Sequence, residues 1–456
     1  MRSSPVKGNK EGNPPRADLY AYYVLGLMTL LVTVNFIDRQ LIAVLSPAIQ
    51  TDLGLTDWQM GAVKGIFFAL LYAFLGVPIA RLADRTNRIN IVATAIASWS
   101  FFTMLCGFVQ TFGQLALARV GVSVGEAGGT APAHSILSDY FPKEQRGFAL
   151  SVFNTGVPLG IASAFIIGGW LVTEHGWRLT FIIMGIPGFV LALLLKFTVR
   201  EPERGRFDSE AAKQNASSAN ASAVSTARHM LRIPTFSMIV IGASIAATAT
   251  YAKNTWIVDF FTRAYPDEPA MRVFVSLGLI QALASTAGIF LTGYFVDRLS
   301  VKDKRMYVLL PAATLVPMLP LWAFCLWTQN FWLAVTLQIP IAFFGSCYMG
   351  PCFALTQTLS PIRVRAVAAA VFLLIINLFG MGVGPTLVGG VSSALMDWLG
   401  NDYSLRAAMT IIVSGYIAAT ITFLLASRKI NEDWKRATEG VDQGRDAAGD
   451  EVAVPA

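Results

Sequence analysis

Charged residues are scarce in this chain, because they make up only 14% of its 456 residues, whereas 54% are hydrophobic. A soluble globular protein carries about 25% charged residues and about 45–50% apolar ones. The composition therefore excludes an ordinary soluble enzyme and a disordered chain, and it favours a protein whose surface faces lipid. The net formal charge of +7 would suit nucleic acid, but the placement of the positive charges, described below, argues against that partner.

Cysteine and histidine are also rare. The four cysteines, Cys106, Cys325, Cys347 and Cys352, lie in apolar runs, and no two form a C-x-x-C pair. The three histidines form no metal-spaced group with cysteine or acidic residues. These absences argue against a disulfide framework and a zinc site. The sequence also lacks a P-loop and a G-x-S-x-G elbow, so we expect neither an ATPase nor a hydrolytic enzyme.

Long apolar runs are what the sequence has in abundance. A membrane helix needs about 20 apolar residues, and twelve such runs are separated by charges, proline or glycine. They cover residues 19–49, 58–81, 89–110, 112–137, 147–172, 177–199, 234–261, 271–296, 306–328, 330–357, 366–395 and 404–427. We therefore expect an all-α membrane protein with twelve transmembrane helices. Thr56, followed by Gln59, predicts a capping box at the start of the second span.

Positive charges alternate between the loops. Of the 35 lysines and arginines, 27 fall in the two termini and in every second loop, and only four fall in the remaining loops. Because cytoplasmic loops carry the excess of Lys and Arg, this bias places both termini in the cytoplasm. We expect a multi-pass plasma membrane protein, typical of a bacterial inner membrane. The basic charge is therefore a signal of topology, and we expect no nucleic-acid partner.

The two halves of the chain repeat each other. Asp84-Arg85 recurs as Asp297-Arg298, 213 positions later, and Gly168-Gly169 recurs as Gly389-Gly390, 221 positions later. Each pair follows or lies in the corresponding span of its half, which indicates two pseudo-symmetric six-helix bundles. Transporters commonly bind substrate near the midplane between such halves. The expected segments are an N-terminal bundle at 1–199, a cytoplasmic linker at 200–232, a C-terminal bundle at 233–430 and a flexible cytoplasmic tail at 431–456.

Several charges lie inside the apolar runs, where each costs at least about 2.5–3.5 kcal/mol and is by default a functional hypothesis. Asp38 and Arg39 lie in the first span, and Arg119 and Glu126 lie in the fourth. Seven helical residues separate Arg119 from Glu126, so both face one side, about 10.5 Å apart along the axis. From their depths we expect Asp38 to approach Arg119, and Arg39 to approach Glu126. These charges either form a functional site or simply neutralise one another.

The seventh span adds the cation Lys253 and the amide Asn254. The central charges then sum to three positive and two negative, a balance that an anionic or zwitterionic substrate would complete. Tyr251 and Tyr348 are further candidates for a cavity lining, although aromatic residues in spans usually just pack. Lys64 lies about six residues into the second span, and we expect its ammonium to reach the membrane interface.

The segment after the second span resembles the cytoplasmic loop motif G-x-L-A-D-R-x-G-R-K/R of the major facilitator superfamily. It reads Ala80-Arg-Leu82-Ala-Asp84-Arg85-Thr-Asn87-Arg88-Ile89. Ala80 and Asn87 replace the two glycines, and Ile89 replaces the last basic residue. The resemblance implies the twelve-helix fold of that superfamily. It also implies that Asp84, Arg85 and Arg88, with Asp297 and Arg298 in the repeat, latch the cytoplasmic side in the outward-facing state.

A narrower resemblance is to the spinster family of lipid transporters, and the N-terminal half carries most of it. The matching segments are Asn35-Phe-Ile-Asp38-Arg39, Ala118-Arg119-Val-Gly121-Val-Ser-Val-Gly125-Glu126-Ala127, Ser138-Asp-Tyr-Phe-Pro142, Gly176-Trp-Arg178 and Arg200-Glu-Pro202. The resemblance implies proton-linked movement of sphingolipid- or lysophospholipid-like amphiphiles. It also assigns Asp38, Arg39, Arg119 and Glu126 to the central polar site.

The leading hypothesis is therefore a secondary transporter that works by alternating access, with a proton as the coupling ion and no other cofactor. Glu126 and Asp38 would carry the proton, and Arg39, Arg119, Lys253, Asn254, Tyr251 and Tyr348 would bind an amphipathic substrate. The alternatives are an organic-anion/proton symporter, which shares an Asn-x-x-Asp-Arg pattern in the first span, and a multidrug exporter. Each chain contains both halves, so we expect a monomer in the lipid bilayer.

Overall fold

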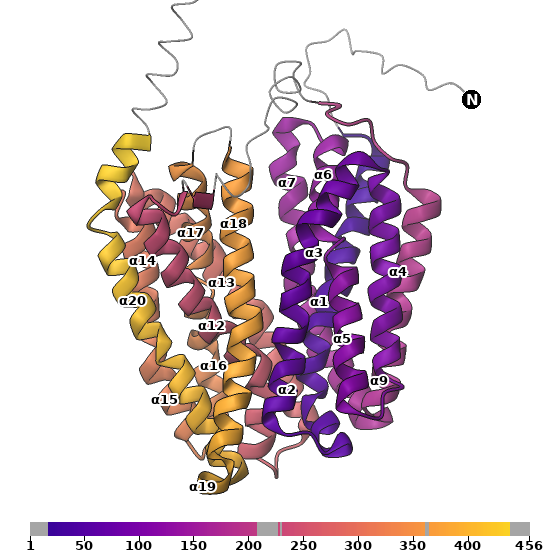
Figure 1. Ribbon diagram of the computed structural model, residues 1–456, viewed down its shortest axis with the longest axis vertical. Helices are drawn as coiled ribbons and strands as arrows, with labels where there is room; N and C mark the ends of the chain where they lie inside the picture. The colour runs from indigo at the N-terminus through magenta and orange to yellow at the C-terminus, as the bar shows by residue number, and fades with distance from the viewer. Residues whose placement is uncertain (1–16, 208–226, 229, 361–363, 438–456) are drawn as a thin grey trace, which may run out of the picture.

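The computed structural model describes residues 17–207, 227–228, 230–360 and 364–437, and this part of the chain is helical (Figure 1). The N-terminal half contains α1 (Leu19–Leu53), α2 (Asp57–Lys64), α3 (Ile66–Arg85), α4 (Arg88–Cys106), α5 (Phe112–Glu126), α6 (Thr130–Tyr140), α7 (Lys143–Asn154), α8 (Gly156–Ser163), the π-helical turn η1 (Ala164–Gly168) and α9 (Gly169–Thr198). The C-terminal half contains α12 (Pro234–Ala264), α13 (Ala270–Ser300), α14 (Met306–Leu315), α15 (Met318–Trp327), α16 (Phe331–Gly345), α17 (Met349–Leu359), α18 (Arg365–Asn377), the π-helical turn η3 (Leu378–Val383), α19 (Gly384–Val413) and α20 (Gly415–Ala426).

These elements make twelve membrane spans, as the sequence predicts. Nine stretches among the described residues are long and apolar enough to cross a membrane. Two of them, 143–198 and 367–426, contain two spans each, because the chain turns at Gly176 (φ 77°) and Gly400 (φ 75°). Such left-handed backbone favours glycine. The remaining span consists of α5 and α6 and contains the buried charges Arg119 and Glu126.

The two halves lie side by side and meet most closely at one end (Figure 1). We call the end that carries the start of α1 and residues 200–207 the linker end, and the end that carries the α1–α2 turn the far end. At the far end, Gly54 closes α1 with a left-handed residue, and Thr56 and Gln59 form the capping box that the sequence predicts. Most of the expected linker and tail lies outside the described residues.

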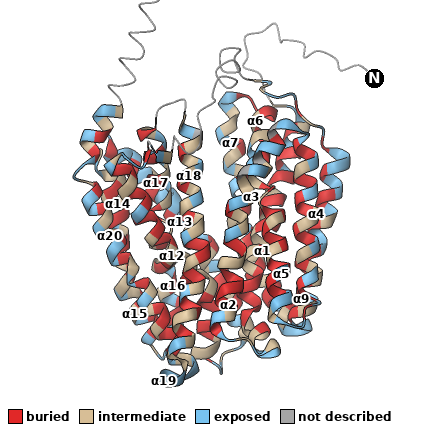
Figure 2. Cartoon of the chain, viewed as in Figure 1, coloured by how far each residue is buried: buried red, intermediate tan, exposed pale blue. Residues whose placement is uncertain are grey.

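Two hydrophobic cores explain this arrangement. One core joins the halves at the far end, where Leu45, Met60 and Phe181 pack with C-terminal residues such as Trp256. The other occupies the linker end of the N-terminal half and consists almost entirely of that half's own residues. Figure 2 shows buried residues running along the inner faces of the helices, with exposed residues outside. The far end is therefore closed by apolar packing, whereas the halves separate toward the linker end.

Glycines bring the backbones into contact at the closed end. A methyl group added to Gly389 of α19 would lie 2.3 Å from the carbonyl oxygen of Asp57, and one added to Gly61 of α2 would lie 2.7 Å from that of Pro385. Small residues allow membrane helices to approach this closely. The close contact between α2 and α19 therefore requires glycine, which has no side chain, at both positions.

The internal repeat is visible in the helix irregularities. The π-helical turns η1 and η3 begin at Ala164 and Leu378, and each interrupts the corresponding span of its half. Breaks also separate α5 from α6, at residues 127–129, and α16 from α17, at residues 346–348. Discontinuous helices in transporters expose backbone groups beside the binding site, so these breaks mark the level at which a site is expected.

Candidate functional site

Four charged side chains gather inside the N-terminal half, from the middle of α1 and from α5. The Arg39 Nε donates a hydrogen bond of 2.5 Å to Glu126 Oε2, and the Glu126 side chain is completely buried. This is the contact expected from helix periodicity. Asp38 and Arg119 are 1% and 2% exposed. Two positive charges thus balance two negative ones, and only the Arg39 side chain, 16% exposed, is partly accessible.

This cluster leaves polar atoms unused. Neither carboxylate oxygen of Asp38 accepts a well-formed hydrogen bond among the described residues, and Arg119 Nε and Glu126 Oε1 likewise have no partner there. Arg119 and Glu126 both act electrostatically on Asp38, so Asp38 approaches Arg119 as their depths predict, although the two side chains form no direct ion pair. A buried polar group without a partner is costly and requires an explanation. A proton, a water molecule or a substrate group could supply the missing contact.

Two aromatic residues of α3 support the arginines, and sequence reasoning missed both. The Arg39 guanidinium lies 4.7 Å from the ring centre of Tyr72, and those of Arg39 and Arg119 lie 5.6 and 5.1 Å from that of Phe68. A cation over an aromatic face gains about 0.5–2 kcal/mol. The only sequence signal was two aromatic residues four positions apart in a span with buried charges, which places both on one helix face.

The local structure of α5 explains the depth of Glu126. A methyl group on Gly125 would lie 2.5 Å from the Trp99 backbone nitrogen, so α5 packs directly on α4. The helix then ends at Glu126, and Ala127 to Gly129 form a turn before α6. The glycines thus place a carboxylate at a helix break inside the span.

The C-terminal half holds a second polar centre around Lys253, which is 3% exposed. Its Nζ donates to Asn254 Oδ1 at 2.7 Å, and Gln281 Nε2 donates to the same oxygen at 2.7 Å. These residues line a cavity together with Gln40, Trp322 and other side chains. The structure therefore brings Lys253 and Asn254 together at a cavity, but it does not place them in the charged cluster of the N-terminal half.

The two candidate tyrosines occupy other positions. Tyr251 is half-buried and packs against both hydrophobic cores, and its ring lies over Gly380. Tyr348 is 4% exposed and belongs to the core that joins the halves. Neither lines the Lys253 cavity. Tyr251 thus lies between the halves, whereas Tyr348 is part of the packing behind it.

Lys64 corrects an expectation, because it does not extend to the membrane interface. Its side chain is 0% exposed, its Nζ pairs with Asp259 Oδ2 at 2.6 Å, and it lies 3.8 Å from the ring centre of Trp256. Ser46 Oγ donates to the other oxygen of Asp259 at 2.5 Å. The prediction was wrong because the partner comes from the other half of the chain, which the pattern of one span does not show.

A second polar layer lies beside this pair at the far end. Arg263 donates to both oxygens of Asp57, at 2.9 and 2.5 Å, and Gln50 and Ser392 donate to the same carboxylate at 2.9 and 2.6 Å. Charged pairs with two parallel bonds have a defined geometry and are strong. Both layers join the halves, so the far end is closed by ion pairs as well as by apolar packing.

The internal repeat contained a signal for these contacts. Ser46 and Asp259 are 213 positions apart, and so are Gln50 and Arg263. This is the separation of Asp84 and Asp297, so repeat-related residues of α1 and α12 meet each other. Applying this separation to α1 would have identified Asp259 and Arg263 before the structure.

The latch residues at the linker end whose contacts are described bind within their own half of the chain. Arg88 is 2% exposed and donates to Asp139 Oδ2 at 2.5 Å and to Glu201 Oε1 at 2.6 Å. Arg85 and Asp297 are exposed, and Arg298 donates to the Tyr294 hydroxyl of its own helix. The side chain of Asp84 lies outside the described part of the chain. In this conformation Arg88 thus fastens the start of the linker to α4 and α6.

These features define a multi-pass membrane transporter: two six-helix halves, charged groups buried between them and one closed end. The chain belongs to the Major Facilitator Superfamily, whose model matches residues 28–385. It is a secondary transporter of this superfamily, and the family resemblance and the twelve-helix fold expected from the sequence are both confirmed. Members of the superfamily are transporters and not enzymes.

Individual relatives narrow the comparison. One similar solved structure is the crystal structure of a bacterial homologue of the human lysosomal transporter spinster, in an inward-facing and unoccupied conformation. Its sequence is 30% identical to this chain and its TM-score is 0.83, and the match covers 91% of this chain and 99% of the homologue. An MFS-type efflux pump of Mycolicibacterium smegmatis is 32% identical over 91% of this chain and 94% of its own length. The probable galactarate/D-glucarate transporter GudP of Bacillus subtilis is 26% identical, and the match covers 89% of this chain and 91% of GudP.

Proposed function

We propose that this protein is a proton-coupled transporter of an amphipathic, lipid-like anion or zwitterion of the sphingolipid or lysophospholipid type. The observation that carries the proposal is the Arg39–Glu126 ion pair, whose carboxylate is fully buried, beside an Asp38 that accepts no well-formed hydrogen bond among the described residues. A buried ion pair of this kind loses its attraction when the carboxylate takes up a proton. Proton binding by the carboxylate then frees the arginine to bind an anionic substrate group at the same site.

The coupling follows from the charges of the cluster. Protonation of Glu126, or of Asp38 beside it, leaves an excess of positive charge on Arg39 and Arg119. An anionic head group restores neutrality by pairing with the released guanidinium groups. In the reverse step, loss of the proton returns Arg39 to Glu126 and expels the head group. The aromatic faces of Phe68 and Tyr72 hold Arg39 in place during the exchange.

A mostly apolar groove supports an amphiphile as the substrate. It lies between α3 and α18 and is lined by Tyr72, Ala73, Gly76, Ala370, Leu374 and Asn377. Tyr72 also contacts Arg39, so the groove adjoins the charged cluster. An acyl chain in this groove would place its head group at the arginines.

Alternating access assigns roles to the two ends. We propose that the linker end faces the cytoplasm of a bacterial cell, because the excess of Lys and Arg lies there, and the conformation described is then inward-facing. The far end must open in the other state, and Asp84, Arg85, Arg88, Asp297 and Arg298 would then latch the linker end. One chain contains both halves and therefore works as a monomer.

A second candidate is an organic-anion/proton symporter. The observation that favours it is the Lys253 cavity, whose amide side chains suit a hydroxylated acid, together with the similarity to GudP. A third candidate, a multidrug exporter, rests on the similarity to the mycobacterial efflux pump. Lysolipids, short hydroxy acids and lipophilic cations separate these three candidates in one competition assay.

The test is proton uptake or release when purified protein is mixed with a lysophospholipid, a sphingosine phosphate, D-glucarate or a lipophilic cation. We expect a proton signal with the amphiphilic anions that is lost in Glu126→Gln. The matched control is Glu174→Gln, the same substitution at an exposed position. An unchanged proton signal in a folded Glu126→Gln protein contradicts the proposal, and a signal with D-glucarate alone favours the second candidate.

A further inference from the structure

The linker end of the C-terminal half carries basic residues that the proposed transport cycle does not use. They lie in the loop between α13 and α14 (residues 301–305) and in the segment after α20 (residues 428–437), and we call these two segments together the basic surface. The two segments contain seven lysines and arginines and three acidic residues. Figure 1 shows α14 and α20 on the outer side of this half, away from the N-terminal half.

Aromatic stacking joins the two segments. The Trp434 ring stacks on that of Tyr307 at the start of α14, with the ring centres 5.6 Å apart and an interplanar angle of 28°. The Lys304 ammonium lies 5.1 Å from the centre of the same Trp434 ring. Lys435 and Arg436 follow Trp434 in the chain and are exposed. Both segments therefore place cations beside one tryptophan, a residue type that is enriched at the membrane–water interface.

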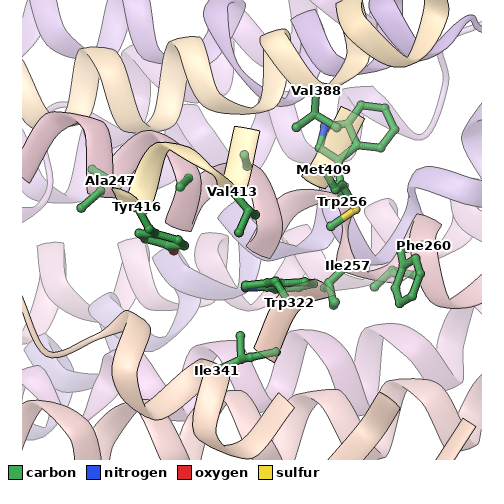
Figure 3. Close-up of a cluster of buried hydrophobic side chains, with 14 of the residues drawn as sticks. Ala247, Trp256, Ile257, Phe260, Trp322, Ile341, Val388, Met409, Val413 and Tyr416 are labelled. Carbon is green, nitrogen blue, oxygen red and sulfur yellow. The ribbon is translucent and has the colours of Figure 1, made fainter. Parts of the chain in front are cut away.

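Residues 428–437 are fixed to the helix bundle. The buried Asp433 accepts a hydrogen bond of 3.0 Å from the Thr235 backbone nitrogen in the first turn of α12. This carboxylate satisfies a free donor at a helix N-terminus, where the helix dipole also favours a negative charge. Helix α12 in turn packs on α20, and Ala247 of α12 and Tyr416 of α20 belong to the same buried core (Figure 3). The basic surface is thus a preformed part of the fold.

The three carboxylates of the basic surface are already engaged. Asp433 caps α12, and Glu432 pairs with Lys429 at 3.5 Å. Asp303 accepts a hydrogen bond of 2.9 Å from the Arg305 backbone nitrogen. No carboxylate in the described part of the chain pairs with four of the cationic side chains, those of Lys302, Lys304, Arg305 and Arg428. Their counter-charge must therefore come from elsewhere.

Exposed apolar side chains border these cations. Leu299 and Val301 lie at the end of α13, and Leu424 and Leu425 lie in the last turn of α20, and all four are exposed. On the outer side of a membrane helix such side chains face the acyl chains of lipids. The cations follow at the ends of the same helices, which is the level of the phosphate groups. A phospholipid beside α13 and α20 would thus contact both kinds of side chain.

We propose that the basic surface binds the head group of an anionic phospholipid in the leaflet at the linker end, with Lys304 and Arg305 as its main cations. Clusters of about four to eight basic residues next to a membrane helix attract anionic lipids. The rule that places positive loops in the cytoplasm explains why charges lie at this end, but it does not explain why two distant segments gather them around one tryptophan. This lipid is distinct from the transported substrate, because the basic surface lies on the outside of the C-terminal half.

The test is lipid selectivity at the basic surface, measured on full-length protein in liposomes. The exposed position Val301→Cys carries a fluorescent label, and the four native cysteines are buried. Brominated phosphatidylglycerol or brominated phosphatidylcholine, each diluted into phosphatidylcholine, quenches the label, and the ratio of the two quenching constants gives the selectivity. The variant is Lys304→Gln/Arg305→Gln. Its matched control, Lys143→Gln/Lys196→Gln, removes two exposed cations at the linker end of the N-terminal half.

We expect the label on the otherwise unchanged protein to report a preference for phosphatidylglycerol of at least about fivefold, the factor that one basic residue near a membrane surface supplies. The preference should fall to about one in Lys304→Gln/Arg305→Gln and remain unchanged in the control variant. High salt should lower it as well, because salt screens exposed charges.

Equal quenching by the two lipids on the otherwise unchanged protein overturns the inference. An equal loss of selectivity in the control variant also overturns it, because the preference would then come from the overall charge of the linker end. Residues 438–456 contain five acidic residues and one arginine. If selectivity appears only after these five are replaced by Asn or Gln, the tail and not a lipid occupies the basic surface, and the inference is wrong. The proton signal of Glu126→Gln tests the proposed function separately.

Discussion

The ion pair between Lys64 and Asp259 gives the sharpest prediction about the closed far end. Both side chains are 0% exposed, and the pair joins α2 of one half to α12 of the other. Lys64→Met leaves Asp259 buried with only the Ser46 hydrogen bond, and Asp259→Asn leaves the Lys64 ammonium over Trp256. Either variant therefore places an unbalanced charge in the closed conformation only.

The size of the effect follows from burial. Removing one partner of a buried ion pair costs about 3–5 kcal/mol. When the far end opens, water reaches the remaining charge, so the open conformation does not bear this cost. Because each 1.4 kcal/mol changes an equilibrium tenfold, a cost of about 3 kcal/mol shifts the balance toward the open far end by about 100-fold or more.

The assay is a distance measurement between spin labels on Gln110→Cys and Trp398→Cys, at the far end of the two halves. Both positions are exposed, and the four native cysteines are buried, so labelling is specific. In the wild-type background we expect one short distance, and in Lys64→Met or Asp259→Asn a population at a longer distance. The double variant Lys64→Met/Asp259→Leu is the control, because replacing both charges by apolar residues is often neutral or stabilising.

Two results would refute this reasoning. If both single variants keep the short distance, the pair does not decide which conformation is stable. If the double variant opens as far as the single ones, the effect comes from lost packing and not from the unpaired charge. The difference between the double variant and the sum of the single ones measures the interaction itself.

Two further predictions concern glycines. Gly389→Ala should open the far end and reduce the short-distance population, because its methyl group would lie 2.3 Å from the Asp57 carbonyl oxygen; Gly390→Ala, with an ordinary contact at 3.5 Å, should leave the distances unchanged. Gly125→Ala should lower the melting temperature, because overpacking costs about 1–3 kcal/mol and its methyl group would lie 2.5 Å from the Trp99 backbone nitrogen. Gly113→Ala meets nothing within 4 Å and should stabilise the protein by about 0.4–1 kcal/mol; equal melting temperatures for the two variants would contradict the packing argument.

Sequence reasoning succeeded where an effect is local or periodic. The twelve spans follow from apolar length, and the contact of Arg39 with Glu126 follows from depth and helix periodicity. The capping box at Thr56 depends on residues three positions apart. Each of these features is determined by the chemistry of one or two spans, so no knowledge of the tertiary arrangement is needed.

It failed where the partner comes from the other half. Lys64 was expected at the interface because it lies only about six residues into its span, yet its partner Asp259 lies 195 positions away in the sequence. Phe68 and Tyr72 were passed over because aromatic residues in spans usually pack without a further role. Asp38 does approach Arg119 as their depths predict, but equal depth does not fix the rotation of two helices, and the side chains form no direct ion pair.

The charges at the far end are suited to a latch that opens repeatedly. A transporter needs two conformations of similar free energy, so the closed far end cannot be much more stable than the open one. Purely apolar packing over the same area would stabilise the closed conformation, and no desolvation of charged groups would offset that gain. A buried ion pair gains little net free energy over its hydrated parts, because desolvation offsets most of the attraction. The Lys64–Asp259 and Asp57–Arg263 pairs therefore fix how the halves align without locking them, and their loss on opening costs the protein little.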